Sequence, residues 1–168
     1  MECGLRIGHG FDVHRIVPGR RLVLGGVEIP WDRGGLLGHS DADVLLHAVM
    51  DAILGALALG DIGHWFPPVD PAFKDADSAR LLQTILADPR TRGWEIVNLD
   101  VTLLAEQPKI APHAEAIRAR LAGLLKIPAA RVSLKATTSE GLGFTGRGEG
   151  MAAQAVVLLQ KAPPPAVE

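Results

Sequence analysis

Apolar residues dominate one continuous stretch of the chain, from Val44 to Leu59, and this stretch predicts a helix buried on most of its circumference. Ser40 and Asp43 have the spacing of a capping box, which predicts that the helix begins near Asp41. Gly60 supplies a left-handed stop at the other end. We therefore expect one long buried helix at the centre of the fold.

The polar exceptions in this stretch are Asp43, His47 and Asp51, which follow one another at intervals of four residues. In a helix, this spacing places them on one face as a single polar stripe. A histidine held between two carboxylates in the core is one interpretation of the stripe, and a functional site is the other. Buried charge needs a partner in either case.

The rest of the chain alternates between short β-type runs and segments with helical spacing, separated by loops rich in glycine and proline. Three helices grouped with these strands predict an α+β fold that forms a single domain over residues 1–161. We expect the helices to cover one face of a sheet. The other face can then pack against a second subunit. A tail over 162–168 with three consecutive prolines is expected to be disordered. The predicted strands span residues 5–16, 94–104, 131–137 and 151–160, and a hairpin of two short strands spans 21–30. The two further helices span 79–87 and 112–125. The main loops are 31–38, 61–73, 105–112 and 138–150.

Composition narrows the classes of function. The chain has 168 residues, of which 48% are hydrophobic, and a formal net charge of -2, so no basic field favours nucleic acid or an anionic membrane. A single cysteine, Cys3, excludes an internal disulfide framework and fits a reducing compartment. We see no signal peptide, and the apolar run is too short to span a bilayer. These features predict a cytoplasmic protein.

A further pair of polar residues lies near the N-terminus, where Asp12 and His14 share one side of a predicted strand. With His47 they supply one carboxylate and two imidazoles, a set suited to Zn²⁺ or a similar divalent ion with one position open to a substrate. The spacing leaves open a hydrogen-bonded network without metal. It also leaves open other ligands, namely His9, His39, His64 and His113.

The stretch from Lys135 to Gly150 combines hydroxyl groups, glycines and Arg147, which is the chemistry of an anion-binding loop. Glu140 would repel a phosphate there unless it held a bridging cation such as Mg²⁺. The alternative is a flexible hairpin loop. A second loop, 105–112, could hold a nucleobase through main-chain groups and a phosphate through Lys109, although its pattern alone favours a surface turn.

The chain resembles the family of 2-C-methyl-D-erythritol 2,4-cyclodiphosphate synthases, enzymes of non-mevalonate isoprenoid biosynthesis. The resemblance runs from about Arg6 to Lys161 and is carried by GHGFDVHR, HSDADVLLHAVMDAILGALALGDIGHWFP, DPAFKDADS, DVTLLAEQPK and KATTSEGLGFTGRGEG. The chain departs from other members at His64-Trp65, where they carry Lys-Leu, and at Gly141, where some carry Lys. These departures remove no expected ligand.

The resemblance implies a homotrimer with active sites between subunits and a cytidine diphosphate substrate. The net charge, by contrast, is what predicts no nucleic-acid or membrane partner. It implies zinc on Asp12, His14 and His47, and Mg²⁺ or Mn²⁺ on Glu140 together with the substrate phosphates. The implied catalytic residues are His39, Thr138 and Glu140. The implied substrate-binding residues are Ser40, Asp61, Gly63, Ala105, Pro108, Lys109, Ala136, Thr137, Thr138, Phe144 and Arg147.

The activity that the resemblance implies is intramolecular attack of a 2-phosphate on the β-phosphorus of a cytidine diphosphate ester, with release of CMP. Two other classes of function stay open. A zinc-dependent phosphohydrolase would use the same open metal to activate water. A non-catalytic module would bind phosphate or isoprenoid diphosphates without turnover.

Overall fold

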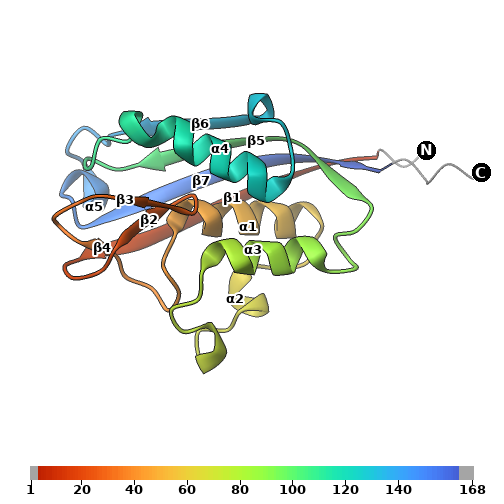
Figure 1. The fold of residues 1–168 in the computed structure, drawn as a ribbon, viewed down its shortest axis with the longest axis horizontal. Helices are drawn as coiled ribbons and strands as arrows, with labels where there is room; N and C mark the ends of the chain where they lie inside the picture. The colour runs from red at the N-terminus through yellow and green to blue at the C-terminus, as the bar shows by residue number, and fades with distance from the viewer. Residues whose placement is uncertain (1–3, 163–168) are drawn as a thin grey trace, which may run out of the picture.

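A mixed sheet forms the back of the molecule and helices cover its front in the computed structural model, which describes residues 4–162 (Figure 1). Cys3 and residues 163–168, most of the predicted tail, lie outside the described residues. The strands are β1 (Leu5–Val17), β2 (Leu22–Leu24), β3 (Val27–Ile29), β4 (Gly35–Leu36), β5 (Trp94–Leu104), β6 (Val132–Thr137) and β7 (Gly150–Lys161). The helices are α1 (Val44–Ala56), α2 (Ile62–Trp65), α3 (Ser78–Ala87), α4 (Ala114–Leu125) and α5 (Gly143–Gly146). Three short 3-10 turns are η1 (Pro71–Phe73), η2 (Ala111–His113) and η3 (Ala129–Arg131).

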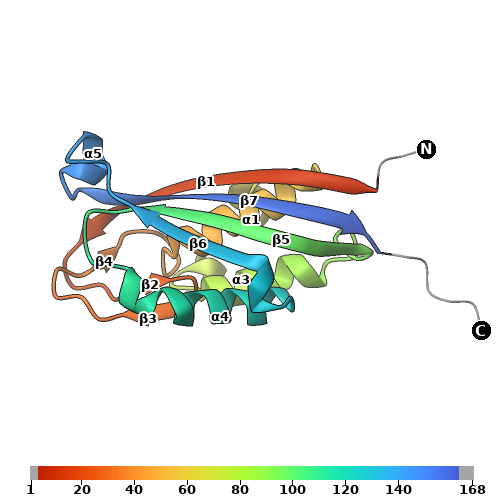
Figure 2. The same ribbon diagram turned by 90° about the horizontal axis from the view of Figure 1, so that it is seen from above.

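The sheet has the strand order β4-β1-β7-β5-β6, in which β5 and β6 are parallel and the other neighbours are antiparallel. The hairpin β2-β3 forms a separate two-stranded sheet. Helix α1 packs on β1 and β7, α4 packs on β6, and α3 packs on α1 and α4. Both ends of the described chain lie at one end of the sheet, and α5 lies at the other (Figure 2). The expected α+β fold is therefore confirmed.

The predicted strands and the three longer helices are present within a few residues of their expected bounds, but three predicted loops contain regular structure. The segment 61–73 was expected to be irregular, yet it contains α2 and η1. The segment 31–38 contains β4, and the segment 138–150 contains α5. These elements are two to four residues long, so local composition carries little signal for them, and tertiary contacts decide whether they form.

The capping predicted for α1 is wrong at both ends. Asp43 is the N-cap, and its side chain accepts hydrogen bonds from the N–H groups of Leu45 and Leu46, so no capping box with Ser40 forms. The helix ends at Ala56, four residues before the expected glycine stop. The long apolar run therefore continues past the helix into a turn that the core still buries in part.

Two glycines allow α1 to lie directly on β1. A Cβ atom at Gly8 would stand 1.7 Å from the carbonyl oxygen of Ala52, and one at Gly10 would stand 1.9 Å from that of Ala48. Because side chains alternate along a strand, the positions that follow on the same face of β1 are Asp12 and His14. The close contact therefore brings the polar end of this face next to the first turn of α1.

The opposite face of β1 carries several apolar side chains that are uncovered in the single chain. Ile7 is 73% exposed and Phe11 is 50% exposed. Val13, also in β1, and Val156, in the neighbouring β7, are exposed as well. A large exposed apolar patch on a sheet usually marks an interaction surface.

Over residues 4–162, none of the helices has both the length and the apolar character that crossing a membrane requires.

Candidate metal centre and substrate pocket

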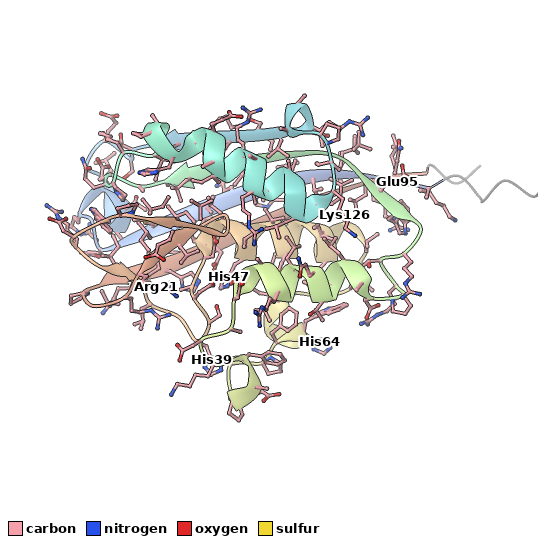
Figure 3. The ribbon with its side chains drawn as sticks, viewed as in Figure 1. Arg21, His39, His47, His64, Glu95 and Lys126 are labelled. Carbon is pink, nitrogen blue, oxygen red and sulfur yellow. The ribbon has the colours of Figure 1, made fainter. Side chains whose placement is uncertain are left out.

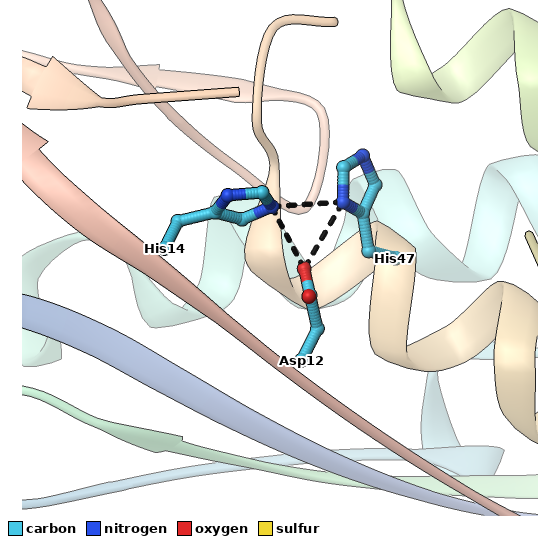
Figure 4. Close-up of side chains that lie close together, drawn as sticks. All are labelled: Asp12, His14 and His47. Carbon is cyan, nitrogen blue, oxygen red and sulfur yellow. Dashed lines mark hydrogen bonds and ion pairs between the residues drawn. The ribbon is translucent and has the colours of Figure 1, made fainter. Parts of the chain in front are cut away.

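Asp12, His14 and His47 meet at one point between β1 and α1 (Figure 4). The Asp12 Oδ2 atom lies 2.9 Å from His14 Nε2 and 3.0 Å from His47 Nδ1, and these two nitrogens lie 3.0 Å apart. Ligand atoms about 2.0–2.1 Å from a tetrahedral Zn²⁺ lie about 3.3 Å from one another, so a small outward movement of the three side chains makes room for the ion. The predicted triad is thus assembled, and its donor set fits a divalent metal.

The two imidazoles of the triad influence the pKa of Asp12, and Asp12 in turn shifts that of His14. Burial by itself raises the pKa of Asp12, but the hydrogen bonds and charges of His14 and His47 outweigh it and hold the pKa well below its usual value. Burial lowers the pKa of His14, yet the hydrogen bond and charge of Asp12 outweigh this effect and raise it. Asp12 is therefore anionic at neutral pH, and a metal at this point would compete with protons for the triad, because ligating groups must be deprotonated.

Backbone and side-chain partners orient both imidazoles. His14 Nδ1 lies 2.8 Å from the carbonyl oxygen of Leu37 and donates to it, because a carbonyl can only accept. This bond leaves the lone pair of His14 on Nε2, which faces the triad. His47 Nε2 points away from the triad toward the hydroxyl groups of Ser78 and Ser40.

A pocket of about 230 Å³ opens beside the triad. His39 and Ser40, from the loop before α1, and Gly63 of α2 line it, as the resemblance implied for a substrate site. His39 Nε2 is within 3.0 Å of the carbonyl oxygen of Asp70. Figure 3 labels His39, which belongs to the loop before α1, and His47, which belongs to α1. The triad, His39, Ser40 and Gly63 therefore form one site.

The outer wall of this pocket is the short helix α2, and two carboxylates hold its start. Asp61 is the N-cap and accepts the N–H of His64 at 2.9 Å. Asp51 accepts the N–H of Ile62 at 2.8 Å. Burial raises the pKa of Asp51, and the negative charges of Asp61 and Asp12 add to the shift. Asp51 thus fixes the loop that carries Asp61 and Gly63.

Asp43 does not join the triad, so the predicted polar stripe divides into three separate roles. Its two carboxylate oxygens accept the N–H groups of Gly25 and Gly26 at 2.8 and 2.6 Å, in addition to those of the first turn of α1. Asp43 is fully buried and joins the β2-β3 turn to the start of α1. Its role is structural, in contrast to that of His47.

Residues 137–140, which include the expected phosphate-binding residues Thr137 and Thr138, lie at the carboxyl end of β6 next to Glu106, which follows β5. We call this group the second cluster. Thr138 Oγ1 donates to Glu140 Oε1 at 2.9 Å. Glu106 Oε1 accepts the N–H of Ser139 at 3.0 Å and that of Gly141 at 3.4 Å, and so holds the turn in place. The sequence prediction missed Glu106. Its acidic side chain beside a predicted anion site was the only signal that could have indicated it.

The expected nucleobase loop adjoins this second cluster. The N–H of Ala105 donates to the carbonyl oxygen of Thr137 at 3.0 Å, which joins the loop to the end of β6. The loop turns through a cis peptide bond before Pro108. None of the residues expected to bind the nucleobase or the phosphates from this half of the chain lines the pocket beside the triad. They are Ala105, Pro108, Lys109, Ala136, Thr137, Thr138, Glu140, Phe144 and Arg147.

The sheet register separates the two clusters within one chain. His14 of β1 pairs with Met151 of β7, and next to it Ala152 pairs with Leu104 of β5, which in turn pairs with Thr137 of β6. The triad and the second cluster therefore lie at the same end of the sheet but three strands apart, about 14 Å at ordinary strand spacing. Among the described residues, Glu140 belongs to no metal-binding group, because the triad is the one such group found.

Comparisons with known proteins show which family and which solved structures the chain is similar to. The model of the YgbB family matches residues 5–160. A protein of Moorella thermoacetica named 2-C-methyl-D-erythritol 2,4-cyclodiphosphate synthase is 61% identical over 155 residues, which cover 92% of this chain and 94% of that protein. A solved structure of a 2C-methyl-D-erythritol-2,4-cyclodiphosphate synthase in its CDP-bound form has a TM-score of 0.84 at 39% identity, with 92% of this chain and all of that chain covered.

A longer protein shares the same fold over part of its length. The bifunctional IspDF from Campylobacter jejuni has a TM-score of 0.88 at 43% identity, and the match covers 94% of this chain but 42% of that protein. The similarity thus spans nearly all of this chain in each comparison.

Proposed function

The chain belongs to the YgbB family, and on this premise we propose that it is a 2-C-methyl-D-erythritol 2,4-cyclodiphosphate synthase. The substrate is 4-diphosphocytidyl-2-C-methyl-D-erythritol 2-phosphate. An oxygen of its 2-phosphate forms a bond to the β-phosphorus of its own diphosphate, the bond from that phosphorus to the oxygen of the α-phosphate breaks, and CMP leaves with that oxygen. The observation that carries the proposal is the open triad of Asp12, His14 and His47 beside a lined pocket.

This reaction needs no protein nucleophile, because the attacking oxygen belongs to the substrate. The protein must align the attacking and leaving oxygens and neutralise the charge between two phosphates. We assign zinc to the triad, where it would polarise the β-phosphate, and Mg²⁺ or Mn²⁺ to Glu140 with the substrate phosphates. His39 and Ser40 lie in the pocket wall, where they can donate hydrogen bonds to phosphate oxygens.

The second cluster completes the proposed site. Ala105, Pro108, Lys109 and Ala136 would bind the cytidine, and Thr137 and Thr138 the diphosphate. Phe144 and Arg147 would flank them, while Asp61 and Gly63 would bind the erythritol hydroxyl groups. The solved structure of a relative in its CDP-bound form supports the nucleotide assignment.

We further propose that the enzyme is a cytoplasmic homotrimer whose active sites lie between subunits. Two observations support the trimer. The triad and the second cluster are three strands apart in one chain, which leaves each half incomplete. The exposed apolar face that includes Ile7 and Phe11 offers a surface for a neighbouring subunit.

Product analysis tests the proposed activity against its rivals. We expect stoichiometric release of CMP and a cyclic diphosphate, identified by phosphorus NMR, and we expect His47→Ala to abolish both products together with bound zinc. Inorganic phosphate or an open-chain diphosphate would instead identify a hydrolase. Saturable binding without CMP would identify a binding module. His113→Ala is a matched control, since His113 lies at the start of α4 and away from the pocket.

A further inference from the structure

Ser78, the first residue of α3, has a buried hydroxyl group that the proposed reaction does not use. Its exposed fraction is 0%, and its Oγ atom lies between His47 and Asp41. The distance from Ser78 Oγ to His47 Nε2 is 3.0 Å, and that to Asp41 Oδ1 is 2.5 Å.

The chemistry of the three groups fixes the direction of both hydrogen bonds. An ionised carboxylate can only accept, so the single proton of the Ser78 hydroxyl is donated to Asp41. The lone pairs of Ser78 Oγ then accept from His47, and Nε2 must carry the proton. A neutral imidazole has one donor and one acceptor nitrogen, so the lone pair of His47 is on Nδ1, the atom that faces Asp12 and His14.

The Asp41 carboxylate holds this arrangement independently of any ligand. Its second oxygen, Oδ2, accepts the backbone N–H of Ser78 at 3.0 Å. The backbone N–H of Asp41 donates to the carbonyl oxygen of Ala76 at 3.0 Å. These bonds join the start of α3 to the segment that precedes α1. The position of the Ser78 hydroxyl is therefore set by backbone contacts on both sides.

Ser40 is a weaker second acceptor for the same histidine nitrogen. Its Oγ atom lies 3.2 Å from His47 Nε2 and also accepts the N–H of Ala42 at 3.2 Å. Ser40 lines the pocket, so its hydroxyl proton remains available to a ligand. Ser78 has no such exposure, which leaves the orientation of the imidazole as its evident task.

We propose that Ser78, backed by Asp41, is a positioning residue that fixes the tautomer and ring orientation of His47 as a metal ligand. The inference rests on the proposed zinc site and adds to it Ser78, a residue that contacts the ligand His47 rather than the metal. Groups that hold the second nitrogen of a ligating histidine typically contribute 10–100-fold to metal affinity. The structure gives this role to a neutral hydroxyl whose own acceptor is a carboxylate.

Zinc affinity tests the proposal directly. The dissociation constant of zinc is measured by competition with a chelator, for the wild type and for Ser78→Ala, at one pH. We expect the wild type to hold one zinc per chain and the variant to bind it about 10–100-fold more weakly. An affinity within twofold of the wild type in a folded Ser78→Ala protein would refute the role. Failure of the wild type itself to bind zinc would count against the proposed function instead.

A spectroscopic measurement separates positioning from a merely structural effect. In the zinc-loaded wild type, nitrogen-15 NMR of His47 should give a protonated Nε2 whose proton exchanges slowly. In Ser78→Ala this proton should exchange much faster. Unchanged exchange would contradict the proposal even if zinc binding weakened.

Two further variants complete the design. Thr91→Ala removes another buried hydroxyl beyond the opposite end of α3, where Thr91 Oγ1 donates to the carbonyl oxygen of Ile85 at 2.9 Å. It should lower stability but leave zinc affinity unchanged. Asp41→Ala removes the acceptor of the Ser78 proton, so the hydroxyl is free to donate to His47 Nε2, and we expect zinc affinity to fall. If Ser78→Ala fails to fold, wild-type zinc affinity in Asp41→Ala would refute the proposal.

Discussion

The guanidinium of Arg90 lies over the indole ring of Trp65, with Cζ 4.4 Å from the ring centroid. Arg90 also pairs with Asp88 through two hydrogen bonds, from Nε at 2.9 Å and from Nη2 at 3.0 Å. On the other side, Trp65 Nε1 donates to the carbonyl oxygen of Leu59 at 3.0 Å. Trp65 therefore attaches α2, the outer wall of the substrate pocket, to the turn after α3.

The first prediction concerns this attachment. Trp65→Leu removes a cation-π contact and a hydrogen bond, together worth about 1–2 kcal/mol. The loop that carries Asp61 and Gly63 should then be less ordered before substrate binds. We expect KM to rise by about 5–30-fold with little change in kcat, measured by CMP release.

Trp94→Leu is the matched control for this prediction. Trp94 is also half-buried beneath an arginine, since Arg6 Cζ lies 5.3 Å from its ring, but it is the first residue of β5 and not part of α2. Its loss should leave KM unchanged. An equal rise in KM for both variants would indicate a general loss of stability rather than a role for Trp65.

The second prediction concerns the second metal. Glu140→Gln replaces a carboxylate with a neutral amide, which is a poorer ligand for a hard cation. We expect zinc content to stay at one per chain, while the Mg²⁺ or Mn²⁺ concentration for half-maximal turnover rises about tenfold. Glu115→Gln, in α4, removes a carboxylate that pairs with Arg118 and should change neither value. Identical metal titrations for wild type and Glu140→Gln would remove Glu140 from the metal site.

The third prediction concerns the shared active site. His47→Ala inactivates the half-site with the triad, and Glu140→Ala inactivates the half-site with the second cluster. When equal amounts of the two variants are unfolded and refolded together, random assembly joins two intact halves in about a quarter of the sites of a symmetric ring. Activity should recover to about a quarter of the wild-type value. Well-folded mixed oligomers without activity would mean that each subunit builds its own site.

The fourth prediction concerns pH and Asp43. Burial raises the pKa of Asp43 to about 6, although the N–H groups of Gly26, Gly25 and Leu46 act in the opposite direction. The folded protein thus binds this proton more tightly than the unfolded chain, whose value is 3.8. Stability from this group is therefore gained as pH falls through 6 and lost as pH rises through it.

The amide of Asp43→Asn cannot titrate, so the difference in stability between the wild type and this variant isolates the contribution of the Asp43 proton. The free energy of unfolding of the wild type, relative to that of the variant, should increase by roughly 1 kcal/mol between pH 7 and pH 5. Denaturant unfolding at three pH values, with protein and zinc concentrations fixed, measures the difference. A difference that is constant over this range, or that falls with acid, would contradict the raised pKa.

Local patterns in the sequence predicted most of the elements, because the periodicity of apolar residues depends only on the geometry of a helix or a strand. They also placed Asp12 and His14 on one side of β1, and the observed strand agrees. The same patterns gave the wrong role to Asp43. Spacing placed it in a stripe with His47, whereas its true partners are the N–H groups of Gly25 and Gly26.

The sequence by itself determined which residue types were available for metal and phosphate chemistry, and which of them share a face of one element. Only the tertiary structure decided which faces meet. His47 reaches Asp12 because Gly8 and Gly10 let α1 rest on the backbone of β1, and its tautomer depends on Ser78, 31 residues away. Periodicity is a local property, whereas contacts between distant residues result from packing the whole core, and no single spacing encodes them.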